Sequence, residues 1–229
     1  MISTSTTHKH VRFAQNRLLQ GLTLWYALVW VITAVRPLDR HDWVLENLLV
    51  VVAVALLVGT YRRFPLSDLS YLLIAVFLTL HAVGAHWTYA EVPVGSWLRD
   101  TIGLARNPFD RLVHFSFGLL LAYPIREVFL RVANARGFWA YYLPFDVTLA
   151  FSAAYEIMEM VVATMVAPGT GDAWLGTQGD VWDAQKDMAS AAVGAVLCMV
   201  VTAVVRRLRA PRPVLLAGPA APRSTASGA

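Results

Sequence analysis

Residues 184–205 read AQKDMASAAVGAVLCMVVTAVV, and after Asp187 this run carries no charged side chain as far as Val205. A helix needs about 20 predominantly apolar residues to cross the hydrocarbon core of a bilayer. Arg206 and Arg207 follow the run directly, and basic residues of this kind are typical of the cytoplasmic end of a membrane span. The run therefore predicts a transmembrane helix.

Five further apolar runs of similar length precede it, at residues 18–35, 43–61, 69–87, 112–130 and 138–165. The whole chain is 57% hydrophobic and 15% charged, with a mean hydropathy of +0.54, which is too apolar for a soluble domain. We predict an all-α, polytopic membrane bundle of six transmembrane helices in one domain, residues 1–209. Residues 210–229, rich in Pro, Ala, Ser and Gly, are expected to form a disordered cytoplasmic tail.

The distribution of lysine and arginine predicts the orientation of these spans, because cytoplasmic loops retain basic residues. With the N-terminus inside, the cytoplasmic set is Lys9, Arg12, Arg17, Arg62, Arg63, Arg126, Arg131, Arg136, Arg206, Arg207, Arg209, Arg212 and Arg223. The other side keeps the smaller set of Arg36, Arg40, Arg99, Arg106, Arg111 and Lys186. Six spans then place both termini in the cytoplasm.

Charge and cysteine content exclude other classes of protein. The net charge is +4, but the basic residues follow the membrane topology and no nucleic-acid-binding motif accompanies them, so we expect no nucleic-acid partner. Cys198 is the single cysteine, which excludes an internal disulfide. The first apolar run is longer than the core of a typical signal peptide and has no clear cleavage site, and we interpret it as a retained helix.

The predicted topology brings four helix ends to the extracytoplasmic face. The third and fifth spans end there, the fourth and sixth begin there, and residues 83–109 form a partly ordered loop beside them. Acids, imidazoles and a tyrosine that are scattered in the sequence therefore converge at His81, His86, Tyr89, Glu91, Asp110, His114, Glu156, Glu159, Asp180, Asp183 and Asp187.

Helical spacing places several of these residues in pairs, since side chains three or four positions apart share a face. Asp110 and His114 form one pair. Asn107 and Pro108 before them are typical of an N-cap and a first helical residue, so Asp110 has the alternative role of a capping carboxylate. Glu156 and Glu159 form a second pair, about 27 to 31 Å along their helix at 1.5 Å per residue. Their alternative role is that of exposed interfacial acids.

The last span begins with Asp180, Asp183 and Asp187 on one stripe. Asp180 could be the N-cap with Asp183 in the first turn, where the positive end of the helix dipole favours acids. Asp187 lies deeper, and an ionised group at membrane depth costs about 2.5 to 3.5 kcal/mol at a helix centre, so it should face a cavity or a partner. The same stripe continues as the small residues Ala191, Gly194 and Cys198, which predicts that it faces the bundle.

Four segments resemble a known family. They are HWTYAEVPVG (86–95), NPFDRLVHFSFGLLL (107–121), AAYEIMEM (153–160) and, the most specific, LGTQGDVWDAQKDM (175–188). With the six-helix layout, they are similar to the YjdF-like bacterial inner membrane proteins over most of the chain. The aspartate, histidine and glutamate arrangement also resembles VanZ-type membrane proteins, more loosely. The first resemblance implies a membrane location and groups the four motifs, but it implies no reaction.

Carboxylates and histidines on facing helices suit a divalent metal, with oxygen ligands favouring Mg, Mn or Ca and histidine favouring Zn or Fe. The predicted ligands are His86, Asp110, His114, Glu156, Glu159, Asp180, Asp183 and Asp187. Of these, the predicted catalytic residues are Asp110, His114, Glu156, Asp183 and Asp187. A hydrolytic site of this kind would act on a lipid or envelope substrate, bound by Arg99, Arg106, Arg111, Tyr89 and Gln178.

Two other classes of function remain open. Intramembrane acids also mark ion or proton pathways, and Asp146 beside Pro144 could extend such a route inward, although an interfacial aspartate beside a kink explains it equally well. In a non-catalytic binding or structural protein, the acids would simply pair with Arg99, Arg106, Arg111 and Lys186.

Overall fold

The computed structural model describes residues 13–165 and 177–210, which form seven α-helices and a short 3-10 helix, Phe13–Gln15. The helices are α1 Arg17–Ala34, α2 Arg40–Thr60, α3 Asp68–His86, α4 Pro93–Ile102, α5 Phe109–Val132, α6 Trp139–Met165 and α8 Asp183–Arg209. All except α4 are long and apolar enough to cross a membrane. The predicted all-α fold with six spans is confirmed. The predicted tail lies outside the described residues beyond Ala210.

Two helices begin about one turn before the predicted apolar run, because residues preceding the run belong to the first turn. Helix α2 begins at Arg40 rather than at residue 43, because the Asp39 side chain accepts the N–H groups of His41 and Asp42. Helix α5 begins at Phe109 rather than at residue 112. A window of apolar residues misses such turns, since caps and not hydrophobicity start them.

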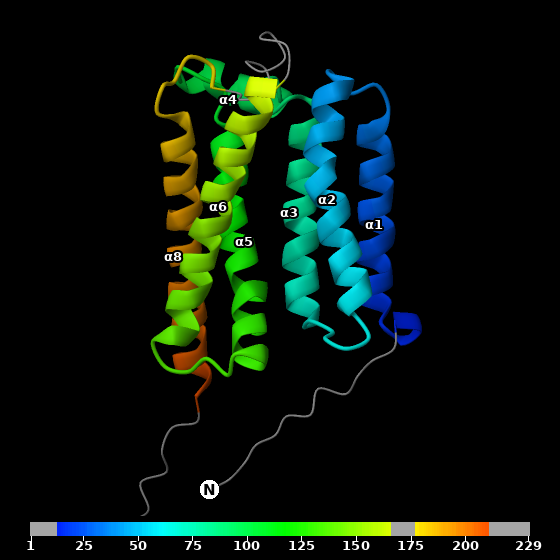
Figure 1. The fold of residues 1–229 in the computed structure, drawn as a ribbon, viewed down its shortest axis with the longest axis vertical. Helices are drawn as coiled ribbons and strands as arrows, with labels where there is room; N and C mark the ends of the chain where they lie inside the picture. Colours follow the sequence, from blue (N-terminus) through cyan, green and yellow to red (C-terminus); the bar gives the residue numbers. More distant parts are fainter. Residues whose placement is uncertain (1–12, 166–176, 211–229) are drawn as a thin grey trace, which may run out of the picture.

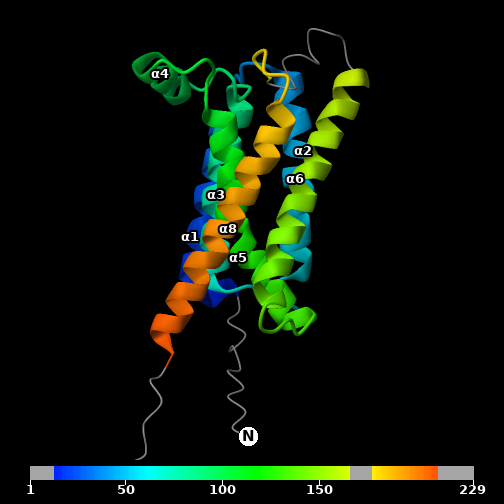
Figure 2. The same cartoon turned by 90° about the vertical axis from the view of Figure 1, so that its left-hand side faces the viewer.

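The six long helices form two groups of three, α1–α3 and α5, α6 and α8 (Figure 1). Helix α3 packs against α1, α2 and α5, and α5 packs against α6 and α8, so α3 and α5 join the two groups. The described chain ends, Phe13 and Ala210, lie at the same end of the bundle. Helix α4 lies across the other end, which we call the α4 end, and projects beyond the side of the bundle (Figure 2).

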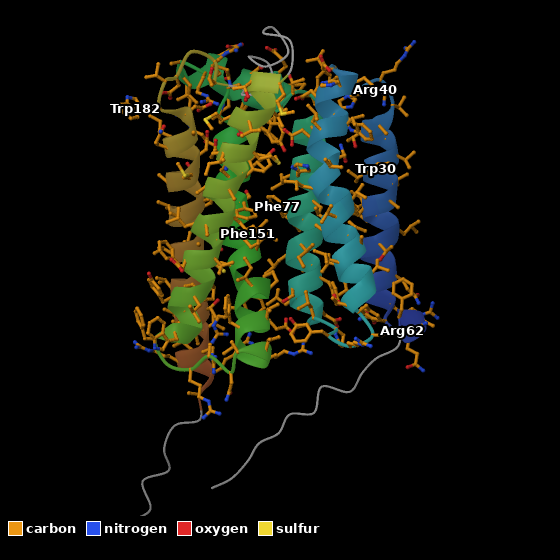
Figure 3. All side chains as sticks on the ribbon, viewed as in Figure 1. Trp30, Arg40, Arg62, Phe77, Phe151 and Trp182 are labelled. Carbon is orange, nitrogen blue, oxygen red and sulfur yellow. The ribbon has the colours of Figure 1, made fainter. Side chains whose placement is uncertain are left out.

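The outer surface of the bundle is apolar in its middle and charged at its ends. Leu24, Trp25 and Ile32 on α1 are exposed, as is Phe151 on α6. Arg40 lies near the α4 end and Arg62 at the opposite end, whereas Phe151 lies about halfway between them (Figure 3). An exposed apolar band of this kind is the surface that a bilayer covers.

Glycine allows α5 and α8 to pack with their backbones in close contact. Gly118 of α5 faces the backbone of Ala191 and Ala195, and Gly194 of α8 faces the backbone of Phe115 and Leu119. Ala191 and Ala195 are fully buried there. The prediction that the small-residue stripe of the last span faces the bundle is confirmed, and the contact belongs to the small-residue class of membrane helix packing.

The connection between α3 and α5 is more ordered than the predicted loop, because it contains α4. Gly95 of α4 packs on Asn107, and a Cβ at Gly95 would lie 2.7 Å from Asn107 Cγ. The Asn107 amide donates to Val92 O at 3.0 Å and to Ser96 Oγ at 3.2 Å. These contacts fix α4 on the start of α5.

Replacing either interfacial glycine should separate α5 from α8. We expect Gly118→Ala and Gly194→Ala each to destabilise the protein by about 1 to 3 kcal/mol, because the added methyl would meet backbone rather than a flexible side chain. Thermal unfolding in detergent measures the change. Gly59→Ala on α2 is the matched control, since nothing lies within 4 Å of its added Cβ. Equal melting temperatures for all three variants would contradict the close contact.

Candidate functional site

The close α5–α8 contact aligns the first turns of the two helices, so that Asp110 and His114 of α5 face Asp183 and Asp187 of α8. Asp183 is 5% exposed and Asp187 is 2% exposed. Arg106, just before α5, forms an ion pair with Asp183 and donates from Nη2 to Asp110 Oδ2 at 3.2 Å. One buried guanidinium therefore bridges the acids of both helices.

Arg111 joins a second set of acids along the edge of α8. Its guanidinium forms an ion pair with Asp180 and approaches Asp183 Oδ1 at 3.4 Å and Asp187 Oδ1 at 3.9 Å. Lys186 Nζ donates to Asp180 Oδ2 at 2.6 Å. The hydrogen bond from Lys186, followed by one from the Trp182 N–H, holds the pKa of Asp180 well below its usual range. Asp180 is therefore an anchor for two cations.

His114 lies at the centre of the buried acids. Its Nε2 is 3.6 Å from Asp110 Oδ1 and 3.6 Å from Glu156 Oε1, which comes from α6. Two triads each have ligand atoms within 4.8 Å of one another, His114 with Glu156 and Asp187, and Asp110 with Asp183 and Asp187. The triads share Asp187. All five residues predicted to be catalytic thus lie together, although this placement does not test their role.

Two carboxylate oxygens in this group lack a hydrogen bond among the described residues. They are Glu156 Oε1 and Asp187 Oδ1, both inaccessible to solvent. Glu156 also shares a hydrogen bond with Glu159, one turn along α6, which requires one of the two carboxyl groups to carry a proton. Both glutamates are partly buried, so the alternative of two exposed interfacial acids is wrong.

A second layer of polar groups on α2 and α6 supports the cluster, and it was not predicted from the sequence. Tyr155 of α6 donates its hydroxyl to Glu46 Oε2 of α2 at 2.8 Å, and the Tyr155 ring packs edge-on to His114. Asp42 and Glu46 on α2 are buried. Their spacing could have identified them, because two acids four residues apart in an apolar span share one helix face, as Asp110 and His114 do.

His81 of α3 and Tyr89, which follows the end of α3, extend this layer. The Tyr89 hydroxyl and His81 Nδ1 are 2.6 Å apart, and His81 Nε2 is 3.3 Å from the Glu46 carbonyl oxygen. Burial and the neighbouring Glu46 raise the pKa of Tyr89 well above its ordinary value, so its hydroxyl stays protonated and donates to Nδ1. The proton of neutral His81 then lies on Nε2 and faces the carbonyl.

Asn107 and Gln178 connect the starts of α5 and α8. Gln178 Oε1 accepts the Asn107 N–H at 2.9 Å, and Gln178 Nε2 donates to the Asn107 carbonyl at 3.3 Å. Asn107 Oδ1 accepts the Phe109 N–H at 3.0 Å. Helix α5 starts at Phe109 with Pro108 as its N-cap residue, so the prediction of Asn107 as the N-cap and Pro108 as the first helical residue is wrong. Both polar ends of Gln178 are thus engaged, which favours a positioning role over substrate binding.

Three other predictions need correction or lie apart from the cluster. Helix α8 starts at Asp183 with Trp182 before it, so Asp180 is not the N-cap, although Asp183 does lie in the first turn. His86 Nδ1 is bonded to the Thr33 carbonyl of α1 at 2.9 Å, and Arg99 pairs with the exposed Asp100. The structure therefore does not bring His86 or Arg99 to the cluster.

The fold and this site define a class, namely a multi-pass α-helical membrane protein with a buried cluster of acids, arginines and histidine at one end. Residues 18–208 match the family model described as "Predicted membrane protein (DUF2238)", and the chain belongs to this family. It is 39% identical over 184 residues to inner membrane protein YjdF of Escherichia coli strain K12, covering 80% of this chain and 88% of that protein. No solved structure matches the chain. The predicted YjdF-like resemblance is confirmed, and the looser likeness to VanZ-type proteins stays a prediction.

Removing Arg106 should destabilise the protein strongly. Arg106→Gln would leave Asp183 and Asp110 without this buried counterion, and breaking one partner of a buried ion pair costs about 3 to 5 kcal/mol. Adding Asp183→Asn to that variant should recover part of the loss. Thermal melting in detergent is the measurement, with Arg99→Gln as the control because its Asp100 pair is exposed. A melting temperature unchanged by Arg106→Gln would contradict the pairing.

Proposed function

We propose that this chain is a bacterial inner membrane protein that binds a divalent metal in the α4-end cluster and uses it to hydrolyse a lipid or envelope substrate at the extracytoplasmic face. The metal ligands in this proposal are His114, Glu156, Asp187 and Asp110. Asp183 remains with Arg106 and Arg111 and orients the first turn of α8. The inner membrane location is carried over from the name of the Escherichia coli relative.

One observation carries the metal proposal, the pair of buried and unbonded oxygens beside His114. An ionised carboxylate that is buried without a partner costs several kcal/mol, so native structures pair such groups, protonate them or bind a cation to them. Arg106, Arg111 and Lys186 pair closely with Asp180 and Asp183, whereas Arg111 Nε is 3.9 Å from Asp187 Oδ1 and His114 Nε2 is 3.6 Å from Glu156 Oε1, both too far for a hydrogen bond. These contacts leave Glu156 Oε1 and Asp187 Oδ1, which belong to the same triad as His114, without a hydrogen bond.

The surrounding residues suit hydrolysis of an ester or a phosphoester. A divalent cation held here would polarise an ester or phosphoryl oxygen and lower the pKa of water. Glu159, hydrogen-bonded to the proposed ligand Glu156, can give or take a proton next to the ligands. Arg111 is 30% exposed at the edge of the cluster, where its guanidinium can contact an anionic substrate group. Tyr155 packs on His114 and holds the imidazole in position.

Charge distribution supports placing the cluster outside the cytoplasm. Among the described residues, the end opposite α4 carries Arg17, Arg62, Arg63, Arg126, Arg131, Arg136, Arg206, Arg207 and Arg209. The α4 end carries Arg36, Arg40, Arg99, Arg106, Arg111 and Lys186, of which three pair with acids of the cluster. The positive-inside rule therefore assigns the α4 end to the extracytoplasmic face.

The structure gives less support to a route through the protein. Asp146, the residue that could extend a proton path inward, is exposed on α6 and does not face the bundle. Below the cluster, the α5–α8 contact is filled by the apolar core of Ala122, Ala195, Cys198 and Met199. Polar groups confined to one end of the bundle, with an apolar core beneath them, favour chemistry at that end over permeation.

Elemental analysis tests the metal directly. We expect detergent-purified protein to hold about one divalent ion per chain, because the three carboxylates and one imidazole of the proposed ligands form a site of the usual mixed composition. Asp187→Asn and His114→Gln should each lose at least about tenfold in metal affinity, as loss of one ligand does. Asp100→Asn, an exposed acid at the same end, is the control. Metal-free wild-type protein that stays metal-free after incubation with Mg, Mn or Zn would refute the proposal.

Cysteine labelling tests the orientation. Cys198 is buried in the apolar core and should give little background with a membrane-impermeant maleimide. We expect Asp100→Cys on the polar side of α4 to be labelled in intact cells, and Ala133→Cys at the opposite end to be labelled only after the inner membrane is permeabilised. The reverse pattern would place the cluster in the cytoplasm and exclude an extracytoplasmic substrate.

A further inference from the structure

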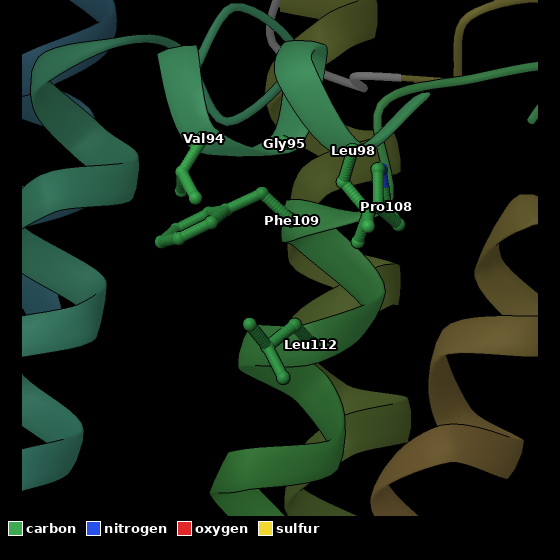
Figure 4. Close-up of a pocket in the computed structure, with 6 residues that line it drawn as sticks. All are labelled: Val94, Gly95, Leu98, Pro108, Phe109 and Leu112. Atoms are coloured by element: carbon green, nitrogen blue, oxygen red, sulfur yellow. The ribbon is translucent and has the colours of Figure 1, made fainter. Parts of the chain in front are cut away.

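An apolar pocket lies beside the acid cluster, between α4 and the first turns of α5 (Figure 4). Its volume is about 220 Å³, and its lining is almost entirely apolar. The lining residues are Val94, Gly95, Leu98, Pro108, Phe109 and Leu112. At about 30 Å³ for a water-sized group, this volume holds about seven such groups in a row or cluster. A short length of acyl chain fits this space.

The pocket and the cluster use opposite faces of the same turns of α5. Phe109 and Leu112 line the pocket, whereas Asp110 and His114 belong to the cluster. Arg111 lies between the two sets in sequence and is 30% exposed. An amphiphile whose chain occupies the pocket therefore has a partly exposed cation on the same turn of α5, toward which its head group can extend.

Helix α4 has the character of a helix that lies at a membrane surface. Its apolar side chains Val94, Trp97 and Ile102 are exposed, and no described part of the chain covers them. Arg99 and Asp100, which pair with each other, provide its polar side. Because α4 crosses the end of a bundle of membrane spans, its exposed apolar side faces the bilayer, as in amphipathic interfacial helices.

The wall that α4 forms is fixed and not loosely attached. Asn107 is fully buried between α4 and α5, with its amide bonded to Val92 and Ser96. Its backbone is bonded to Gln178, which leads into α8. The same residue thus sets the position of the pocket wall and of the acids on α8, which keeps the distance between a chain in the pocket and the cluster constant.

We propose that this pocket holds an acyl chain of an anionic membrane lipid, whose head group lies at Arg111, and that such lipids are the substrate class of the neighbouring site. The inference rests on the proposed function for the chemistry at the head group. Binding of the acyl chain in the pocket does not depend on the proposed function. Lipids of the surrounding bilayer supply the chain, and the partly exposed guanidinium selects an anionic head group.

Photolabelling in nanodiscs tests whether an acyl chain binds in the pocket. The probe is phosphatidylglycerol with a diazirine on one acyl chain, and the readout is the yield of crosslinks in each peptide. We expect labelling to concentrate on residues 94–112. Leu98→Trp should reduce it about tenfold, because the indole fills the space that the chain needs. Ile102→Trp, on the same helix but outside the pocket, should stay within about twofold of wild type.

Competition separates the sources of the anion. Unlabelled phosphatidylglycerol should displace the probe better than phosphatidylcholine, and inorganic phosphate should not displace it. Equal displacement by phosphatidylcholine would contradict the proposed selectivity for an anionic head group. Displacement by phosphate alone would contradict the binding of an acyl chain in the pocket.

The result can be distinguished from a failure of the metal proposal. Asp187→Asn should lose metal and keep the acyl labelling, while Leu98→Trp should keep metal and lose the labelling. Labelling spread evenly over the exposed apolar residues of α1 and α4 in wild-type protein would overturn the inference, even if Leu98→Trp failed to fold.

Discussion

The site depends on the glycine contact between α5 and α8. Gly118 and Gly194 let the two backbones meet halfway along the bundle. The acids of both first turns then lie within reach of the same arginine, Arg106. A wider helix separation would move Asp183 away from Asp110 and leave buried charges in an apolar surrounding, which is the costliest arrangement available to a membrane protein. Small residues in the middle of the spans therefore make the polar end of the bundle tolerable.

Charge compensation at the cluster is uneven, so one part of it is held by close ion pairs and another part is not. Asp180 and Asp183 are held by Arg106, Arg111 and Lys186, and they anchor the start of α8. Glu156 and Asp187 each keep an oxygen without a hydrogen bond. Buried groups that are fully paired stabilise a fold, whereas buried groups that are left partly unpaired mark sites where a ligand completes the arrangement.

The sequence predicted the spans and the convergence of acids for reasons that hold without tertiary detail. An apolar run of sufficient length must become a helix in lipid, and alternate span ends must share a face, so Asp110, Glu156 and Asp187 had to lie near one plane. What could not be predicted was the lateral arrangement. The bond between Tyr155 and Glu46 depends on which helices are neighbours, and His86 reaches the cluster end but turns toward Thr33 of α1. The depth of a residue in the membrane can be obtained by counting along its span, whereas the helices beside it are decided by tertiary packing.

The depth of the cluster also bears on its function. Its side chains come from the first two turns of α5 and α8 and from the facing part of α6, and the apolar core around Ala122 and Met199 lies beneath them. An ion or proton route needs polar groups at successive depths, whereas a lipid head group needs them at one depth. The concentration of acids, arginines and an apolar pocket at a single level of the bilayer fits a reaction on a molecule that stays in the membrane while its polar end is processed.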